Sequence, residues 1–163
     1  EKEKKREFKL ETRRLKEKVK TRSEWIDDAQ RAFNRFVRMR DWGKPCISCG
    51  RNDDEVMPTD GWKPGGAWDC GHYKTRGAYP ELRFIPIAAH RQCKSCNGGS
   101  GKYQKKSRTV SAEYEERLRD RIGNDMVDFL NGPHPLRKYT IEELKEIKQA
   151  FNAWANELEK LID

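Results

Sequence analysis

Apolar residues recur at steps of three and four in two parts of the chain, which is the spacing of a helix with one buried face. The first stripe predicts a helix over residues 21–42, with buried positions at Trp25, Ala29, Ala32, Phe33, Phe36 and Val37. Thr21 and Glu24 have the spacing of a capping box, which satisfies two backbone N–H groups at a helix start. Gly43 follows the last turn and ends the helix.

The second stripe predicts a final helix that runs nearly to the end of the chain. Its apolar positions are Ile141, Leu144, Ile147, Phe151, Trp154, Leu158 and Leu161. Thr140 and Glu143 repeat the capping-box spacing at its start. Two shorter helices are predicted before it, the first stopped by Gly123 and the second capped by Asn124. Residues 109–163 are therefore expected to form C-terminal helices, with a linker at "GPHPLRKY" (132–139) before the last one.

The remaining segments have weaker patterns. Residues 1–20 are rich in Lys, Glu and Arg with a thin apolar stripe, so they predict a solvated helix or a partly disordered basic arm. Residues 43–108 are interrupted by Gly and Pro. Two strands are predicted there, in "AWDCGHY" (67–73) and "LRFIPIAAH" (82–90). The second is expected at a sheet edge, because Pro86 has no N–H to donate.

Composition and charge point to a partner. Only 34% of residues are hydrophobic and 38% are charged, which is lean for a compact core and suits solvated helices. The net charge is +8; residues 1–22 carry eleven basic and five acidic side chains, and residues 70–108 carry nine basic and one acidic. Such basic blocks attract nucleic acid, although a charged block is often only a solubilising face. No membrane-length apolar run or secretory signal is visible, so no membrane partner is expected.

Two CxxC pairs, Cys46/Cys49 and Cys93/Cys96, predict a metal centre. Four thiolates suit a tetrahedral Zn²⁺ ion, and such an ion has no open position, so its role is expected to be structural. The 43 residues between the pairs must fold between them. The alternative is two unrelated pairs or redox sites. Cys70 is left over, and it is expected to be a small, partly buried side chain.

The order of these motifs resembles a known family. The segments "CISCG", "WDCGHYKT", "LRF" and "HRQCKSCN" follow one another as in the zinc-containing HNH (His-Me finger, ββα-metal) nucleases. With the basic arm before them and "RIG…YTIEELKEIK" after them, they are similar to the phage lambda NinG (Rap recombination endonuclease) family over roughly residues 20–150. The resemblance implies an α+β fold that is mostly helical, with a small zinc-stabilised ββα-metal (HNH-like) core at residues 43–108. This core would be embedded between long α-helices in one nuclease domain, residues 21–163.

The resemblance also implies a catalytic set. His72 in the first strand would be the general base that activates water, and Asp69 and Asn97 would hold one Mg²⁺ or Mn²⁺ ion. Related motifs place the acid directly before the histidine, where this chain has Gly71. Asp69 and His72 are an odd number of residues apart, so a regular strand would turn them to opposite faces. A bulge at Gly71 would bring them together.

Elementary chemistry is consistent with these roles. Phosphodiester cleavage needs a nucleophile at neutral pH, which a neutral imidazole generates by accepting a proton from water, and it needs positive charge near the leaving oxygen. The alternative for His72 is a hydrogen-bonded, half-buried histidine. The side chains predicted to bind the nucleic-acid backbone are Lys74, Arg76, Arg83, His90, Arg91, Lys94, Lys102, Lys105 and Lys106. For His90 the alternative is that it orders the second cysteine pair.

The function implied by the resemblance is a structure-selective, metal-dependent DNA endonuclease of phage recombination, which cleaves branched DNA such as Holliday junctions and D-loops. A junction has two symmetric cleavage points, so a homodimer is expected. Phage or host recombination proteins are further expected partners, in the cytoplasm of the bacterial host. The alternative is a non-catalytic zinc-stabilised module that binds nucleic acid, which would leave Asp69, His72 and Asn97 without a role.

Overall fold

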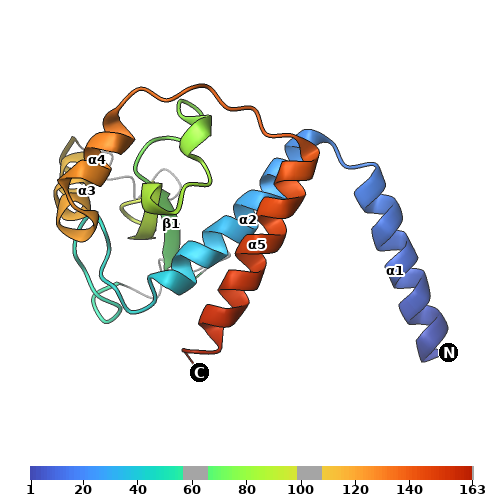
Figure 1. Ribbon diagram of the computed structural model, residues 1–163. Coiled ribbons are helices and arrows are strands. Elements are labelled where there is room, and N and C mark those ends of the chain that lie inside the picture. The colour runs from blue at the N-terminus through green and yellow to red at the C-terminus, as the bar shows by residue number, and fades with distance from the viewer. Residues whose placement is uncertain (57–65, 99–107, 163) are drawn as a thin grey trace.

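The computed structural model describes residues 1–56, 66–98 and 108–162. Its helices and strands are α1 (Lys2–Lys18), α2 (Arg22–Arg40), β1 (Trp68–His72), β2 (Ala89–Cys93), α3 (Arg108–Ile122), α4 (Asn124–Asn131) and α5 (Ile141–Glu159). The two-stranded sheet lies between α2 and α5 on one side and α3 and α4 on the other (Figure 1). The described chain is thus mostly helical around a small sheet, as predicted. None of its helices has an apolar stretch long enough to cross a membrane.

Helices α2 and α5 run side by side in the same direction and form the larger core (Figure 1). Both begin with the predicted capping box, in which the threonine hydroxyl accepts from the glutamate N–H and the glutamate carboxylate accepts from the threonine N–H. Phe33 and Phe151 meet edge to face with ring centroids 4.9 Å apart. The apolar stripe of α2 is buried, whereas Trp154 and Leu161 near the end of the chain remain exposed.

The sheet departs from the prediction in its second strand. β1 matches the first predicted strand, and it pairs antiparallel with β2. Residues 82–88 are not a strand, because two short 3-10 helices, Pro80–Leu82 and Pro86–Ala88, occupy most of that segment. Proline has the fixed φ that suits the first position of a helix and lacks the N–H that a ladder needs. The second strand therefore begins only at Ala89.

The predicted bulge at Gly71 is absent. The ladder is one-to-one throughout, and Gly71 lies directly opposite His90. Glycine is required here for another reason: a Cβ atom at this position would clash with the side chain of Gln92. Gln92 in turn donates to Ser48 Oγ at 2.6 Å, so the missing side chain makes room for a contact with the first cysteine pair.

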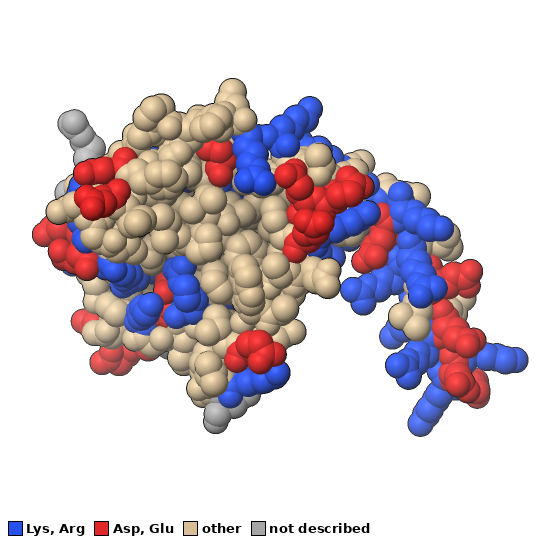
Figure 2. Space-filling view, viewed as in Figure 1, with Lys and Arg blue, Asp and Glu red and all other residues tan. Residues whose placement is uncertain are grey.

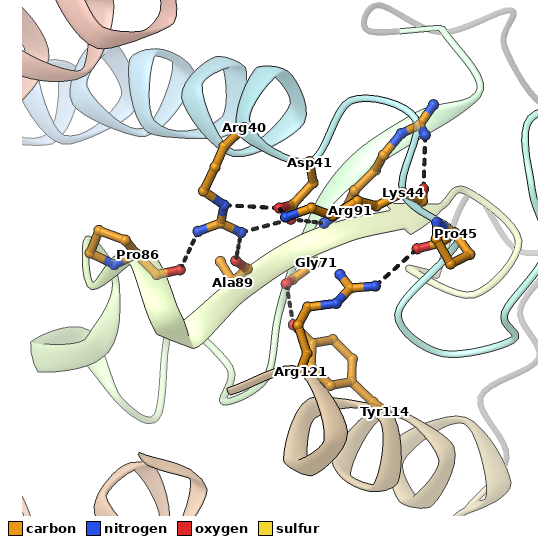
Figure 3. A network of polar contacts seen from close by, with 10 residues as sticks. All are labelled: Arg40, Asp41, Lys44, Pro45, Gly71, Pro86, Ala89, Arg91, Tyr114 and Arg121. Carbon is orange, nitrogen blue, oxygen red and sulfur yellow. Dashed lines mark hydrogen bonds and ion pairs between the residues drawn. The ribbon is translucent and has the colours of Figure 1, made fainter. Parts of the chain in front are cut away.

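Helices α3 and α4 cover the other face of the sheet. Tyr114 of α3 is buried and donates a hydrogen bond to the carbonyl oxygen of Gly71 at 2.8 Å (Figure 3). The two predicted helices are confirmed, but the predicted cap is wrong. Asn124 is the first residue of α4, and the N-cap is Gly123 with φ 85°. A left-handed φ of this kind allows the sharp turn between the helices, and only glycine adopts it readily.

A network of polar contacts fastens the end of α2 to β2 (Figure 3). Asp41 is fully buried and accepts hydrogen bonds from the side chains of Arg40 and Lys44 and from the backbone N–H of Arg91. Arg40 also donates to the carbonyl oxygens of Pro86 and Ala89 at 2.7 and 2.8 Å. The position of β2, which ends at the second cysteine pair, is therefore set by the last turn of α2.

Substitution of Asp41 by Asn is expected to lower the free energy of unfolding by about 3 kcal/mol, since it removes the buried charge that pairs with the partly buried Arg40 and leaves the donors around it without a full set of acceptors. Burial by itself raises the pKa of Asp41, but the hydrogen bond and charge of Arg40 outweigh burial and lower the pKa to about 2. The stabilisation is therefore present above about pH 4 and is lost as the pH falls toward 2.

Urea unfolding at neutral and acidic pH measures both effects, with the exposed Asp54→Asn as the control. Equal stability of the Asp41→Asn protein and the wild type at neutral pH would contradict this role for the network.

Candidate metal centre and polar cleft

The two predicted cysteine pairs meet at one point. The Sγ atoms of Cys46, Cys49, Cys93 and Cys96 all lie within 4.8 Å of one another. Cys49 Sγ and Cys93 Sγ are 3.7 Å apart. A tetrahedral zinc site with Zn–S bonds of about 2.3 Å has sulfur–sulfur edges of about 3.8 Å, so the sulfur arrangement fits this ion. The prediction that the distant pairs come together is confirmed.

Each pair sits on a tight turn that aims both sulfurs the same way. The N–H of Gly50 donates to the carbonyl oxygen of Cys46 at 2.9 Å, and the N–H of Asn97 donates to that of Cys93 at 3.0 Å. Gly50 and Gly98, which follow the two pairs, have φ values of 73° and 80°. These left-handed conformations let the chain leave each turn without strain.

Arg51 is a cation in direct contact with the sulfurs. Its guanidinium donates to Cys49 Sγ and to Cys93 Sγ, both at 3.3 Å, and to Ser95 Oγ at 2.5 Å. The contact with Cys49 is the largest cause of the raised pKa of Arg51. Donors around the sulfurs favour thiolates, which are the form that binds metal. Sequence reasoning missed Arg51, although its place two residues after a CxxC pair was a usable signal.

Cys70 is not part of the cluster, as expected. It is 7% exposed and packs in the core between the sheet and α2. Burial raises the pKa of its thiol to about 12, so it is a neutral, apolar side chain at physiological pH. It offers a natural control for the four clustered cysteines.

An open cleft of about 810 Å³ lies beside β1. Its lining includes all three predicted catalytic residues together with three arginines: Asp69, His72, Asn97, Arg38, Arg76 and Arg83. Asp69 and His72 border the same cleft although no bulge turns them to one face. Within the described residues β1 pairs only with β2, so its outer edge is open and both faces of the strand reach a cleft on that side.

His72 has a defined proton arrangement. Its Nε2 atom lies 2.9 Å from the carbonyl oxygen of Arg83. A carbonyl oxygen only accepts, so Nε2 carries the proton and Nδ1 keeps a free lone pair. Burial and the charges of Arg76 and Arg83 lower the pKa of His72 to about 4, although the carbonyl contact raises it. The imidazole is therefore neutral at physiological pH, and Phe33 packs against it with ring centroids 5.6 Å apart.

Asp69 and Asn97 are in contact within the cleft. Asn97 Nδ2 lies 3.2 Å from Asp69 Oδ2, and the ammonium group of Lys94 lies 2.6 Å from Asp69 Oδ1. The Lys94 side chain is only 8% exposed, and its positive charge compensates the negative charge of the Asp69 carboxylate. The carboxylate and amide oxygens of this pair are the hard donors that Mg²⁺ and Mn²⁺ prefer, usually with water as the remaining ligands. The residue types thus fit a divalent cation, although the Asn97 amide presents its nitrogen to Asp69 in this structure.

The basic residues predicted to bind nucleic acid fall into separate groups. Arg76 and Arg83 border the cleft, and Lys74 lies next to it over the ring of Tyr73. His90 is 3% exposed and Arg91 2% exposed, a placement that favours structural roles over phosphate contact. Three further predicted residues lie outside the described part of the chain: Lys102, Lys105 and Lys106.

Arg91 shows why a basic residue in this segment is buried. Its guanidinium stacks over Trp68 at 3.7 Å from the ring centroid and pairs with the carboxylate of Asp53. It also donates to the carbonyl oxygen of Lys44 at 2.9 Å (Figure 3). Sequence reasoning missed Arg38, which reaches the cleft from the polar side of α2. Its neighbour one turn earlier, Asn34, reaches the same cleft, so an i, i+4 polar pair opposite the apolar stripe was the available signal.

The fold and the cysteine cluster define a small, mostly helical protein with a candidate structural metal site. The chain belongs to the NinG family, because a family model described as "Bacteriophage Lambda NinG protein" matches residues 1–161. It is 40% identical to "Protein ninG" of Escherichia phage lambda over 143 residues, which are 88% of this chain and 60% of that protein. It is 39% identical to "Protein ninG" of Salmonella phage P22, again over 88% of this chain and 61% of that protein.

The chain thus spans about 60% of the length of the lambda relative that it matches. No solved structure matches it. The expected membership of the NinG family is confirmed, and the match extends beyond the predicted range to include α1. The placement among HNH nucleases stays a prediction.

Zinc analysis of the purified protein is expected to find about one ion per chain, because four thiolates bind one tetrahedral ion. Cys93→Ser is expected to lose the ion and to lower the melting temperature, since metal binding contributes directly to folding. Cys70→Ser is the control and is expected to keep the ion. Retention of zinc by the Cys93→Ser protein would contradict the four-cysteine assignment.

Proposed function

We propose that this chain is a metal-dependent DNA endonuclease of the HNH (His-Me finger) type, with a structural Zn²⁺ ion and a catalytic Mg²⁺ or Mn²⁺ ion. The observation that carries the proposal is the presence of His72, Asp69 and Asn97 in one arginine-lined cleft beside the cysteine cluster. In this proposal β1 and β2 are the two strands of the ββα-metal unit. The Rap-type activity follows from the resemblance of the motifs.

His72 supplies the base. Its neutral imidazole has a free lone pair on Nδ1, which accepts a proton from a water molecule as that water attacks phosphorus. The carbonyl oxygen of Arg83 accepts a hydrogen bond from Nε2–H. This hydrogen bond holds the ring in this tautomer and stabilises the imidazolium that forms. The contact with Phe33 restricts rotation of the ring. Position and protonation state thus agree with the role of a general base.

The arginines of the cleft supply the phosphate site. Arg76 and Arg83 both line the cleft, and the Arg83 side chain donates to the carbonyl oxygen of Arg76 at 3.4 Å. Burial and the charge of Arg76 lower the pKa of Arg83, which shows that positive charge is crowded there. A phosphodiester in the cleft would relieve this repulsion and place the reacting phosphorus near His72. Contacts of this kind position a backbone without reading bases.

Asp69 and Asn97 would hold the divalent cation. When bound, the cation would supply the positive charge that stabilises the leaving oxygen. Lys94 donates to Asp69 Oδ1 and Asn97 Nδ2 donates to Asp69 Oδ2, so the two potential ligand residues are neighbours. Cation binding would require the Asn97 amide to turn its oxygen toward Asp69 Oδ2. Two protein oxygens are a typical number for Mg²⁺, which keeps several waters.

Branched DNA is the proposed substrate class, with a C2 homodimer as the proposed assembly. The two strands cleaved at a four-way junction are related by symmetry, which two copies of one cleft match. Phage or host recombination proteins are proposed partners on the basis of the motif resemblance alone. The alternative, a zinc-stabilised module that binds DNA without cleaving it, is separated from the nuclease by the experiments that follow.

The His72→Ala protein is expected to lose at least about a hundredfold in cleavage rate, because a general base contributes this much or more. Its affinity for DNA is expected to remain near that of the wild type. His134→Ala, in the linker before α5, is the control and is expected to cleave normally. Cleavage of labelled four-way and linear DNA is measured beside binding; DNA binding by a wild type that does not cleave with Mg²⁺ or Mn²⁺ would favour the non-catalytic module.

The Asp69→Ala and Asn97→Ala proteins are expected to require a higher Mn²⁺ concentration for half-maximal cleavage, since each loses one oxygen ligand. Both are expected to retain zinc, because neither residue belongs to the sulfur cluster. Calorimetric titration with Mn²⁺ gives the affinity without relying on cleavage. An unchanged Mn²⁺ affinity in both proteins would refute this ligand pair.

A further inference from the structure

Helix α1 has 17 residues and buries none of them. It projects from the start of α2 and stands apart from the core (Figure 1). Its junction with α2 is anchored by Asp28, which accepts hydrogen bonds from Lys20 at 2.6 Å and from Lys148 of α5 at 2.9 Å. The C-terminal end of α1 is therefore fixed to the core, and the helix buries none of its side chains against any other part of the described chain.

The charges of α1 are sorted by face. At 3.6 residues per turn, six basic residues fall within about 100° of the helix circumference. They are Lys2, Lys5, Arg6, Lys9, Arg13 and Lys16, and all six are exposed. The acidic residues of the helix, Glu3, Glu7, Glu11 and Glu17, lie outside this arc. These six residues form the basic face of α1.

These charges are largely uncompensated. Within the described residues the ion pair formed by the basic face is that of Arg13 with Glu17, at 3.7 Å and with Arg13 73% exposed. Such an exposed pair contributes little. Lys9, Arg13 and Lys16 also border a hollow of about 450 Å³ that reaches Lys20 at the junction. The positive surface thus continues from the arm onto the core, and Figure 2 shows Lys and Arg side chains along the arm and its base.

We infer that the basic face of α1 binds the phosphate backbone of duplex DNA, at a site separate from the cleft. From Lys2 to Lys16 the face is about 21 Å long at 1.5 Å per residue. That length covers about six base pairs at 3.4 Å per step of one strand. Free cations at successive turns of a straight helix suit contact with a duplex backbone and carry no base specificity.

A membrane surface fits this helix less well. The exposed apolar residues of the arm are Phe8, Leu10, Leu15 and the C-cap Val19, and Leu10 lies on another side of the helix. The remaining three form a stripe narrower than the broad apolar face of helices that lie in a membrane interface. The basic face is twice as populated as this stripe. Binding of duplex DNA by α1 does not depend on the proposed function. That the bound duplex is part of the DNA substrate cleaved in the cleft does rest on the proposed function.

The test compares two triple variants of the full chain that change the net charge equally. Lys5, Lys9 and Lys16 are changed to Gln on the basic face, and the control changes Lys4, Arg14 and Lys18 to Gln on the opposite side of the helix. Gln keeps a good helix former at each position. Binding of a fluorescent duplex is measured by anisotropy over a range of salt concentrations.

The basic-face variant is expected to bind about tenfold more weakly. The slope of log affinity against log salt concentration is expected to fall in magnitude by about 2 to 3, because each lost phosphate contact removes about 0.9 from the slope. The control is expected to resemble the wild type. Equal weakening of both variants would overturn the proposal, since only net charge would then matter. So would unchanged DNA affinity together with lost binding to vesicles containing phosphatidylglycerol.

The two proposals fail in different ways. If the wild type does not cleave, the proposed nuclease fails, but the anisotropy comparison still decides the role of α1. If the wild type cleaves, the basic-face variant is expected to raise KM with kcat retained, because the cleft is unchanged. A fall in kcat with no change in duplex affinity would overturn the binding role.

Discussion

The meeting of two cysteine pairs, separated by 43 residues, is the constraint on which the rest of the structure depends. Cys46 follows α2, and Cys93 ends β2. Closing this loop through sulfur fixes β2, and β1 is fixed because it pairs with β2 over its whole length. Asp69 and His72 lie on β1, and Asn97 lies just after the second pair. The cleft is therefore built partly on a short two-stranded sheet whose second strand ends at the cysteine cluster.

Helix α2 connects this small centre to the larger core. Its apolar stripe packs against α5, its last turn holds β2 through Arg40 and Asp41, and its polar side contributes Arg38 to the cleft. Three sides of α2 therefore contribute to the core, to the position of β2 and to the cleft. Phe33 of α2 connects the core to the cleft, because its ring contacts both Phe151 in the core and His72 at the cleft.

Sequence reasoning succeeded where the signal was local. Capping boxes and apolar stripes predicted α2 and α5, and paired thiols have few uses other than metal in this context. It failed where a distant contact decided the outcome. Arg91 has the charge of a surface residue, yet Asp53 and Trp68 compensate its burial. Likewise, Gly71 has the appearance of a bulge, although its purpose is to admit the side chain of Gln92. Asp53, Trp68 and Gln92 all lie far along the chain from the residues that they contact, so no local sequence pattern reveals these contacts.

The contact between Lys94 and Asp69 has a consequence for how the cleft is loaded. With an ammonium group already beside the carboxylate, the negative charge of Asp69 is balanced by a side chain of the protein itself. If a divalent ion binds there as proposed, it has to compete with this tethered cation. Such a resident competitor would make occupancy rise only at a higher free ion concentration, and in an ion-poor solution the carboxylate would stay paired with Lys94.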